Sequence, residues 1–409
     1  MSADPSLIEV NQSPPEPAAP GVVVGVYAVD AGDGIAQLLA TAETLADGFP
    51  DRPGAVLALD AGSTDGTLEA MRAWAHAGAP PHRRLVLDLP QPLGEGPALA
   101  RILSAAAELG AEGLLLVSGE LARVAPEALR ALAEPVASGQ ADLALPLYTR
   151  GPGEGTLTTN LLAPLTAALY GHAVQQVAGG CAAVSGALLR GALTEAPGAS
   201  QWHGPGAEVW LTTTALATRA RTVQVHLGPR PPRVGGREAD VATILAQTVG
   251  PLFTLMERHH ERWLDARGSE PAPLVGPPPA WIADDDRRDV ERLVRAFRLG
   301  LKDLLPVWEQ ALDESTLGEL YPLALLAADE FELPAPLWAR VVSDFAVAHH
   351  ERRLPRDHLY RSLAPLYLGR VAAFFLELRH APAGAAAAVL DRVTRAFEEE
   401  KPSLAARWR

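Results

Sequence analysis

The chain has 409 residues, 48% of them hydrophobic, with a net charge of −14 and a mean hydropathy of +0.07. This is the composition of a globular protein that is long enough for two domains. The acidic balance argues against nucleic acid or an anionic membrane surface as a partner, because either needs a clustered basic face. No apolar run is long enough for membrane insertion, and the single cysteine, Cys181, excludes an internal disulfide. We therefore expect a cytoplasmic protein.

The first part of the chain predicts alternating strands and helices. Residues 1–20 are rich in Pro, Glu and Asp, and we expect them to form a flexible tail. Residues 21–27 are a continuous apolar run of the kind found in strands that are buried on both faces. The alternation then continues with strands over 55–60, 84–88 and 114–117 and helices over 35–46, 67–77 and 97–109. This order predicts a mostly parallel, doubly wound α/β sheet, which binds its ligands at the carboxyl ends of the strands.

The second part changes character. A helix over 126–137 and a strand over 142–147 lead into a loop-rich region, and residues 266–280 have the Pro-rich composition of a linker. Apolar residues then recur at helical spacing over 284–305, 316–329, 337–350 and 363–378. We expect an α/β domain over 21–265 and a helical C-terminal domain over 281–409, whose exposed apolar stripes would suit a homodimer.

One turn carries a candidate site. Residues 59–67 read Leu-Asp-Ala-Gly-Ser-Thr-Asp-Gly-Thr, so that Asp60 ends a predicted strand and Gly62, Ser63 and Asp65 follow it. Such a turn offers carboxylate, hydroxyl and backbone N–H groups to a nucleoside. Alone, the same residues also fit an ordinary strand-to-helix turn, with Thr64 or Asp65 as the helix cap.

Further segments extend this motif into a family pattern. In chain order they are Gly94–Leu99, Gly155–Thr158, Gly179–Gly180, Gly206–Val209, Leu227–Arg230 and Leu363–Arg370. Together they resemble nucleotide-sugar glycosyltransferases of the GT-A fold, and among them the retaining glucosyl-phosphoglycerate and mannosylglycerate synthases. The resemblance implies a GT-A, Rossmann-like domain followed by a helical one. It also implies hexose transfer from a donor of the UDP-glucose or GDP-mannose type to a small hydroxy-acid or sugar acceptor.

The resemblance also assigns roles to single residues. The implied catalytic residues are Glu208 and Arg230. The implied nucleotide-binding residues are Asp60, Gly62, Ser63, Asp65, Gly94 and Ser118, and the implied acceptor-binding residues are Thr158, Gly179 and Gly180.

The chain departs from the family where the donor diphosphate and its metal ion are expected. In the family an Asp-x-Asp triplet holds Mg²⁺ or Mn²⁺ together with a histidine. In this chain the position of the triplet reads Ser118-Gly119-Glu120, and the position of the histidine is occupied by Pro232. The family also has a lysine that meets the donor's negative charge, and Glu95 stands in its place. The family's carboxylate after the Gly-Gly pair is replaced by Cys181. Of the family's metal ligands, only Glu120 is retained as a candidate.

Two interpretations of these departures remain open. In the first, the chain is an active transferase whose metal site is rebuilt from Glu120 with His226 or His203, or whose cation is an arginine, the candidates being Arg101, Arg123 and Arg230. In the second, the chain is an inactive homologue that binds a nucleotide, a sugar or a protein. Both lysines of the chain, Lys302 and Lys401, lie in its last part, so a diphosphate in the α/β domain would meet arginine, a metal ion or helix N-termini.

Overall fold

The computed structural model describes residues 7–9, 20–48, 54–78, 82–87, 95–151, 153–194, 206–234, 239–279, 289–381 and 385–409. The chain forms two compact units that interleave along the sequence. The sheet unit comprises Met1–Thr149, Ala178–Glu238 and Pro273–Pro279, and the helical unit comprises Arg150–Val177, Ala239–Ala272 and Ala280–Arg409. The contiguous division that we predicted, with boundaries at 265 and 281, does not coincide with these units.

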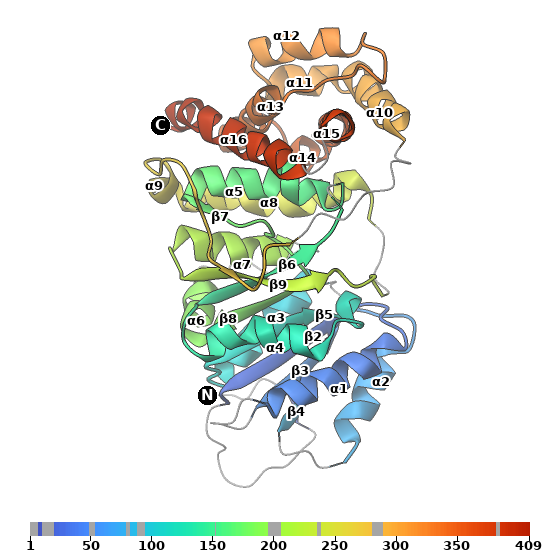
Figure 1. Ribbon diagram of the computed structural model, residues 1–409, viewed down its shortest axis with the longest axis vertical. Coiled ribbons are helices and arrows are strands. Elements are labelled where there is room, and N and C mark those ends of the chain that lie inside the picture. Colours follow the sequence, from blue (N-terminus) through green and yellow to red (C-terminus); the bar gives the residue numbers. More distant parts are fainter. Residues whose placement is uncertain are drawn as a thin grey trace. The chain divides into compact units, whose positions relative to one another are not determined.

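The sheet unit is built on a nine-stranded sheet in the order β1-β4-β3-β2-β5-β8-β6-β9-β11 (Figure 1). The strands are β1 (Leu7–Glu9), β2 (Val22–Ala28), β3 (Ala55–Asp60), β4 (Arg83–Leu87), β5 (Gly113–Ser118), β6 (Leu143–Thr149), β8 (Cys181–Ser185), β9 (Thr222–Pro229) and β11 (Leu274–Val275). The pairs among β4, β3, β2 and β5 are parallel, as are β6–β9 and β9–β11, whereas β8 runs antiparallel to both β5 and β6. The predicted mostly parallel α/β sheet is therefore confirmed.

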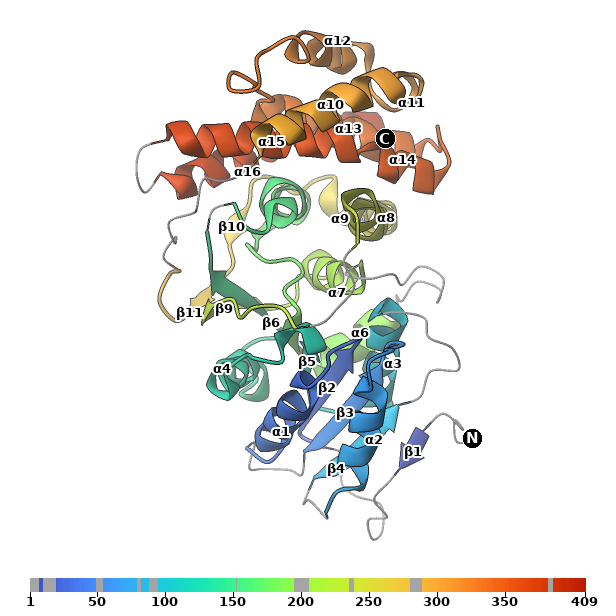
Figure 2. The ribbon, with the colours of Figure 1, turned by 90° about the vertical axis from the view of Figure 1, so that its right-hand side faces the viewer.

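Helices cover both faces of this sheet, which is why its central strands read as unbroken apolar runs. The helices α1 (Gly34–Ala46), α2 (Thr67–His76) and α4 (Pro126–Ala137) share one apolar core with the inner residues of the strands. The helices α3 (Glu95–Glu108), α6 (Gly186–Thr194) and α7 (Gly206–Ala217) pack together on the other face. Figure 2 shows α1 and α4 on one side of the sheet and α3 and α6 on the other. Every residue of β2 and β5 is buried as a result.

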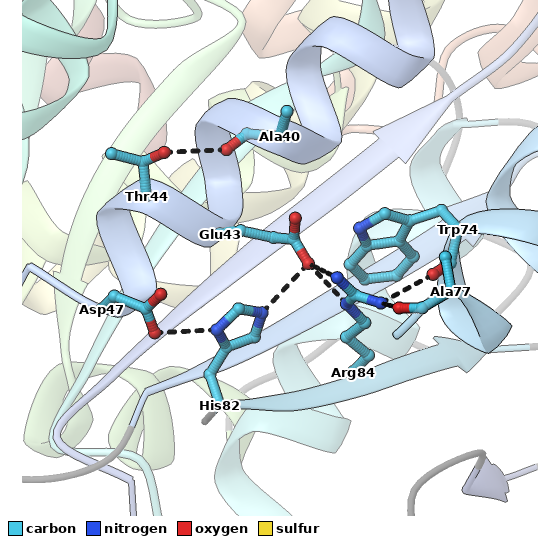
Figure 3. A network of polar contacts seen from close by, with 8 residues as sticks. All are labelled: Ala40, Glu43, Thr44, Asp47, Trp74, Ala77, His82 and Arg84. Atoms are coloured by element: carbon cyan, nitrogen blue, oxygen red, sulfur yellow. Dashed lines mark hydrogen bonds and ion pairs between the residues drawn. The ribbon is translucent and has the colours of Figure 1, made fainter. Parts of the chain in front are cut away.

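A polar network ties α1, α2 and β4 together (Figure 3). The imidazole of His82 contacts Asp47 at 2.8 Å and Glu43 at 3.2 Å. The guanidinium of Arg84 binds Glu43 through Nε and Nη2, donates to the carbonyls of Trp74, at 3.0 Å, and Ala77, and lies over the Trp74 ring. Because the Arg84 side chain is only 10% exposed, loss of Glu43 would leave a buried cation without its counter-ion.

We predict that Glu43→Ala lowers the free energy of unfolding by about 2–4 kcal/mol, since removal of one partner strands the other buried charge. Urea unfolding followed by circular dichroism measures the difference. Glu134→Ala removes an exposed glutamate from α4 and serves as the control, with an expected change of about 0.5 kcal/mol or less. Equal effects of the two substitutions would show that the network contributes nothing beyond an ordinary surface charge.

The helical unit contains the remaining elements. They are the π-helix η2 (Thr158–Leu162), α5 (Ala163–Tyr170), α8 (Val241–Arg258), α9 (His260–Trp263), α10 (Val290–Asp303), α11 (Leu305–Ala311), α12 (Glu314–Leu323), α13 (Ala335–His350), α14 (Arg356–Ser362), α15 (Ala364–His380) and α16 (Ala386–Trp408), with the short parallel strands β7 (His172–Ala173) and β10 (Glu270–Pro271). The helix α5 packs against α16 and α8 against α14, so segments before residue 265 belong to this unit. The helix predicted over 316–329 ends at Leu323, directly after Pro322.

Buried polar side chains fix the centre of the helical unit. Arg370 is fully buried and donates to Asn160 Oδ1 at 3.1 Å, to the Leu333 carbonyl at 2.8 Å and to Glu377. Asn160 lies in η2, and its carbonyl accepts a bond of 2.6 Å from the Trp338 indole. A second buried cation, Lys401, donates to the carbonyls of Leu169 and Ala266, and burial lowers its pKa to about 8.

Among the residues that the structure describes, no helix combines the length and the apolar character that a membrane crossing requires. The homodimer expected from the sequence stays a prediction.

Candidate functional site

Three neighbouring strands of the sheet unit end at one edge of the sheet. Ala28, the last residue of β2, is in register with Asp60 at the end of β3, and Tyr27 is in register with Ser118 at the end of β5. The carboxyl ends of parallel strands form the ligand-binding edge of such sheets. The structure therefore brings Asp60 and Ser118, both predicted from the sequence, to this edge.

Asp60 turns the chain and leaves one oxygen without a partner. Its Oδ2 accepts the backbone N–H groups of Gly62 and Ser63, each at 3.0 Å. Gly62 has a φ of 104°, which a side chain would disfavour. The other carboxylate oxygen, Oδ1, is buried and has no hydrogen-bond partner. A buried acceptor of this kind costs free energy unless a donor reaches it, which is what a bound ligand can provide.

The turn after Asp60 is joined to the loop that follows β2. The Ser63 hydroxyl accepts the Asp30 N–H at 2.8 Å, and Asp65 Oδ2 accepts the Gly32 N–H at 2.7 Å. Asp65 Oδ1 also accepts from the N–H and the hydroxyl of Thr67, at the start of α2. Burial alone would raise the pKa of Asp65, but the bonds from Thr67 and Gly32 outweigh it and lower the pKa. Ser63 and Asp65 thus hold two loops in place around Asp60, and Asp65 additionally serves the start of the helix.

Glu208 is held by three hydrogen bonds from two other segments. Its Oε1 accepts from the Tyr27 hydroxyl at 2.7 Å, and its Oε2 accepts from the N–H groups of Gly179 and Gly180 at 2.8 and 2.9 Å. Burial, together with the nearby Glu208 carboxylate, raises the pKa of Tyr27, so the phenol stays protonated and keeps donating. These contacts make Glu208 the residue that positions the Gly-Gly turn, and its catalytic role stays a prediction.

The segment that we expected at the position of the Asp-x-Asp triplet forms a short 3-10 turn, η1 (Gly119–Leu121). The Ser118 hydroxyl accepts the Glu120 N–H at 3.3 Å, and the Ser118 N–H donates to the Gly180 carbonyl at 2.7 Å. The Glu120 carboxylate forms an ion pair with Arg233, whose loop also docks on η1 through the Val234 N–H and the Glu120 carbonyl, at 3.1 Å. Glu120 therefore already has a cation of its own.

This set of residues does not fit a divalent metal ion. Mg²⁺ and Mn²⁺ need several oxygen or nitrogen ligands converging on one point. In the part of the chain that the structure describes, no group of three His, Cys, Asp or Glu side chains converges in this way. His226, considered above as a ligand, contacts the Thr149 hydroxyl at 2.8 Å, and His203 lies outside the described residues.

Three glutamates and one arginine share this edge of the sheet. Burial raises the pKa of Glu95 from 4.5 to about 7, helped by the negative charges of Glu120 and Glu208 and opposed by Arg233. Any repulsion between Glu95 and a diphosphate is therefore reduced near neutral pH, where part of the Glu95 population is protonated.

A second group lies behind the Gly-Gly turn. The Tyr148 hydroxyl donates to the Gly179 carbonyl at 3.2 Å and lies 3.4 Å from the sulfur of Cys181. Burial raises the pKa of Cys181 to about 12, which excludes it as a nucleophile at neutral pH. The Arg230 guanidinium lies 5.7 Å from the centre of the Tyr148 ring, and its buried Nε has no hydrogen-bond partner.

The remaining sequence predictions fall elsewhere. Thr158 is buried in η2 of the helical unit, so its acceptor-binding role stays a prediction. Gly94 lies outside the described residues. Sequence reasoning missed Tyr27 and Arg233. The available signals were the end of the first strand, for Tyr27, and the position directly after Pro232, where the family has its metal-binding histidine, for Arg233.

Comparison with solved structures finds similar chains. Glucosyl-3-phosphoglycerate synthase from Mycobacterium tuberculosis, in complex with Mn²⁺, UDP-glucose and phosphoglyceric acid, is 25% identical over 59% of this chain and 80% of that chain, with a TM-score of 0.44. Mannosyl-3-phosphoglycerate synthase from Rubrobacter xylanophilus is 17% identical over 59% and 75%, with a TM-score of 0.39. TarS from S. aureus, in complex with UDP-GlcNAc, is 15% identical over 94% and 92%, with a TM-score of 0.39.

A glucosyl-phosphoglycerate synthase, one of the two kinds of synthase that the sequence motifs resemble, is thus among the solved structures to which the chain is similar. No family model matches the chain, and neither does any of the curated proteins.

The raised pKa of Glu95 predicts a pH-dependent effect of Glu95→Gln on stability. Below pH 4.5 the carboxyl is protonated in both the folded and the unfolded chain, so its ionisation adds no difference. Between pH 4.5 and about 7 the unfolded chain releases the proton first, so the parent protein loses stability as pH rises. We therefore expect the gain in unfolding free energy from Glu95→Gln to grow over this interval and to reach roughly 1–3 kcal/mol at pH 8.

Urea unfolding at pH 4, 6 and 8 checks this prediction. Glu134→Gln, which changes an exposed carboxylate on α4, is the control and should show no such trend. A gain that is independent of pH, or one that grows toward low pH, would contradict the assignment of a raised pKa to Glu95.

Proposed function

We propose that the chain is a glycosyltransferase that moves a hexose from a nucleotide diphosphate sugar, of the UDP-glucose or GDP-mannose type, to a small hydroxy-acid or sugar acceptor. The observation that carries the proposal is the buried, unpartnered Oδ1 of Asp60 at the carboxyl edge of the sheet. An N–H group of a nucleobase or a ribose hydroxyl is the kind of donor that this oxygen lacks. The order and spacing of the family motifs supply the donor class.

In the proposed reaction the bond between the anomeric carbon and the diphosphate oxygen breaks, and its electron pair leaves on the diphosphate. The acceptor oxygen forms the new bond to the anomeric carbon, and its proton passes to the departing phosphate. The resemblance predicts that the anomeric configuration is retained. Such a reaction needs no strongly nucleophilic side chain, which is compatible with the high pKa of Cys181. It needs stabilisation of the negative charge on the leaving group.

Within this scheme each residue of the edge has a distinct task. Asp60 accepts a hydrogen bond from the nucleoside, and Ser63 and Asp65 keep its turn closed. Glu208 keeps Gly179 and Gly180 in the conformation that the turn requires. Gly180 has a φ of 81°, and a Cβ there would lie 3.1 Å from Leu121, so the turn has no room for a larger residue.

Calorimetric titration with uridine, guanosine, UDP, GDP and their glucose and mannose conjugates tests the proposal. We expect one nucleoside series to bind, and Asp60→Asn to weaken it by roughly tenfold or more, because the substitution places an N–H where the ligand's donor would lie. Asp142→Asn is the matched control. Asp142 also accepts a backbone N–H, that of Arg221 at 3.0 Å, but lies beside the amino end of β6, and its substitution should leave binding unchanged.

The conjugate that binds is then incubated with the protein and candidate acceptors, and the release of the nucleoside diphosphate is measured. If no nucleoside or conjugate binds, the proposal fails at its first step. Binding without transfer to any hydroxy-acid or sugar acceptor would contradict the transferase and leave a nucleotide-binding protein.

A further inference from the structure

We propose that Arg233 takes the place of the divalent cation at this site, so that the diphosphate of the donor is bound by a guanidinium and without a metal ion. The inference rests on the proposed function and deepens it, since it names how the same site neutralises its substrate. It differs from the metal-dependent arrangement that the sequence resemblance implies.

Arg233 lies on a loop that is anchored beside the proposed nucleoside site. Its loop docks on η1 through the backbone bond between Val234 and Glu120, and the Val234 side chain lies against Gly34, at the start of α1. The turn itself packs on the end of β2, because a Cβ added at Gly119 would come within 2.5 Å of the Ala28 side chain. Ala28 is the register partner of Asp60. Arg233 is thus fixed to the segment that occupies the Asp-x-Asp position, next to the proposed nucleoside site.

The side chains that would ligate a metal ion already have partners. The Ser118 hydroxyl accepts the Glu120 N–H, and the Glu120 carboxylate is paired with Arg233. A metal ion would have to displace the arginine from a glutamate that is 14% exposed and would then find a single carboxylate. One carboxylate is too few for a hard cation that favours six oxygen ligands.

Arg233 keeps N–H donors beyond the one that binds Glu120. Its side chain is 62% exposed, and it binds Glu120 through Nη2. A guanidinium carries five N–H donors, and the contact with Glu120 uses Nη2, so the N–H groups of Nε and Nη1 remain able to donate hydrogen bonds to phosphate oxygens. Both lysines of the chain belong to the helical unit, so the sheet unit itself contributes no lysine to this task.

The negative charges of the three glutamates near Arg233 are compensated in different ways. Glu208 is compensated by the Tyr27 hydroxyl and by two backbone N–H groups, and Glu95 is partly protonated near neutral pH. Among the described residues, the Glu120 carboxylate is compensated by its ion pair with Arg233. An arriving diphosphate would therefore meet Arg233, the cation that lowers the pKa of Glu95 among the described residues.

The test compares the affinity for a nucleoside with the affinity for its diphosphate, by calorimetry in EDTA and in excess Mn²⁺. In the parent protein we expect the diphosphate to bind more tightly than the nucleoside, and equally well under both conditions. Arg233→Gln should reduce diphosphate affinity by about tenfold or more and leave nucleoside affinity unchanged. Glu120→Gln keeps the shape of the turn but removes a negative charge beside Arg233, and should raise diphosphate affinity by about threefold.

Arg221→Gln is the matched control. Arg221 is 60% exposed and is paired with Asp142, which is 23% exposed. The variant therefore removes the same charge from a similar ion pair, which lies beside the amino end of β6. Its diphosphate affinity should equal that of the parent. Thermal unfolding verifies that each variant is folded, and Glu120→Gln carries the test if Arg233→Gln is not.

The possible results separate the two proposals. A tenfold or larger gain in diphosphate affinity with Mn²⁺, or undiminished binding by Arg233→Gln, overturns the role of Arg233 while the nucleoside site stands. Weaker diphosphate binding by Glu120→Gln overturns it as well, because this result would indicate that the Glu120 carboxylate holds a metal ion against the diphosphate. Failure of both nucleosides and both diphosphates to bind overturns the proposed function and this inference with it.

Discussion

The candidate site depends on the carboxylate of Glu208, which accepts three hydrogen bonds from two other segments. It joins α7 to the end of β2 through Tyr27 and to the turn before β8 through two glycine N–H groups. From that turn the Gly180 carbonyl accepts the Ser118 N–H, and the Ser118 hydroxyl accepts the Glu120 N–H. A continuous path of hydrogen bonds therefore runs from the core of the sheet unit to the exposed guanidinium of Arg233. Removal of its first member would leave several buried polar groups without partners.

The path also bears on how an acidic edge could bind the negatively charged donor that we propose. Glutamates so near one another would repel each other if each were ionised and unpaired. The structure deals with each of them differently, through hydrogen bonds at Glu208, through an ion pair at Glu120 and through a raised pKa at Glu95. These residues are therefore connected, since the pKa of Glu95 responds to both Glu120 and Arg233.

Much of the sheet unit could be predicted because its signals are local. Unbroken apolar runs identified β2, β3 and β5, and the position of Asp60 and Ser118 at their ends placed both residues on one edge. Two partners of Glu208 could not be predicted, because they are backbone groups of a turn nearly thirty residues away, which carry no sequence identity. The third, Tyr27, comes from a strand far away in the sequence. Arg233 was missed for a related reason. Its role depends on a loop docking on η1, and nothing in the local pattern specifies that contact.

The interleaved units show the same limit at a larger scale. Helical periodicity identified α10, α13 and α15, but it could not reveal that η2, α5 and α8 belong with them, since that depends on contacts between distant segments. The bonds from Trp338 and Arg370 to Asn160 are one such contact within the helical unit. Buried side chains that reach across a hundred residues or more are chosen by the packed structure and not by their neighbours in sequence.

The placement of the two lysines has a practical consequence. Both belong to the helical unit, and while Lys302 is exposed, Lys401 is buried against two carbonyl oxygens. Lysine-directed chemistry, whether enzymatic acetylation or coupling to an amine-reactive surface, therefore has no side-chain target in the sheet unit. A protein immobilised through Lys302 would keep the whole edge around Asp60 chemically untouched.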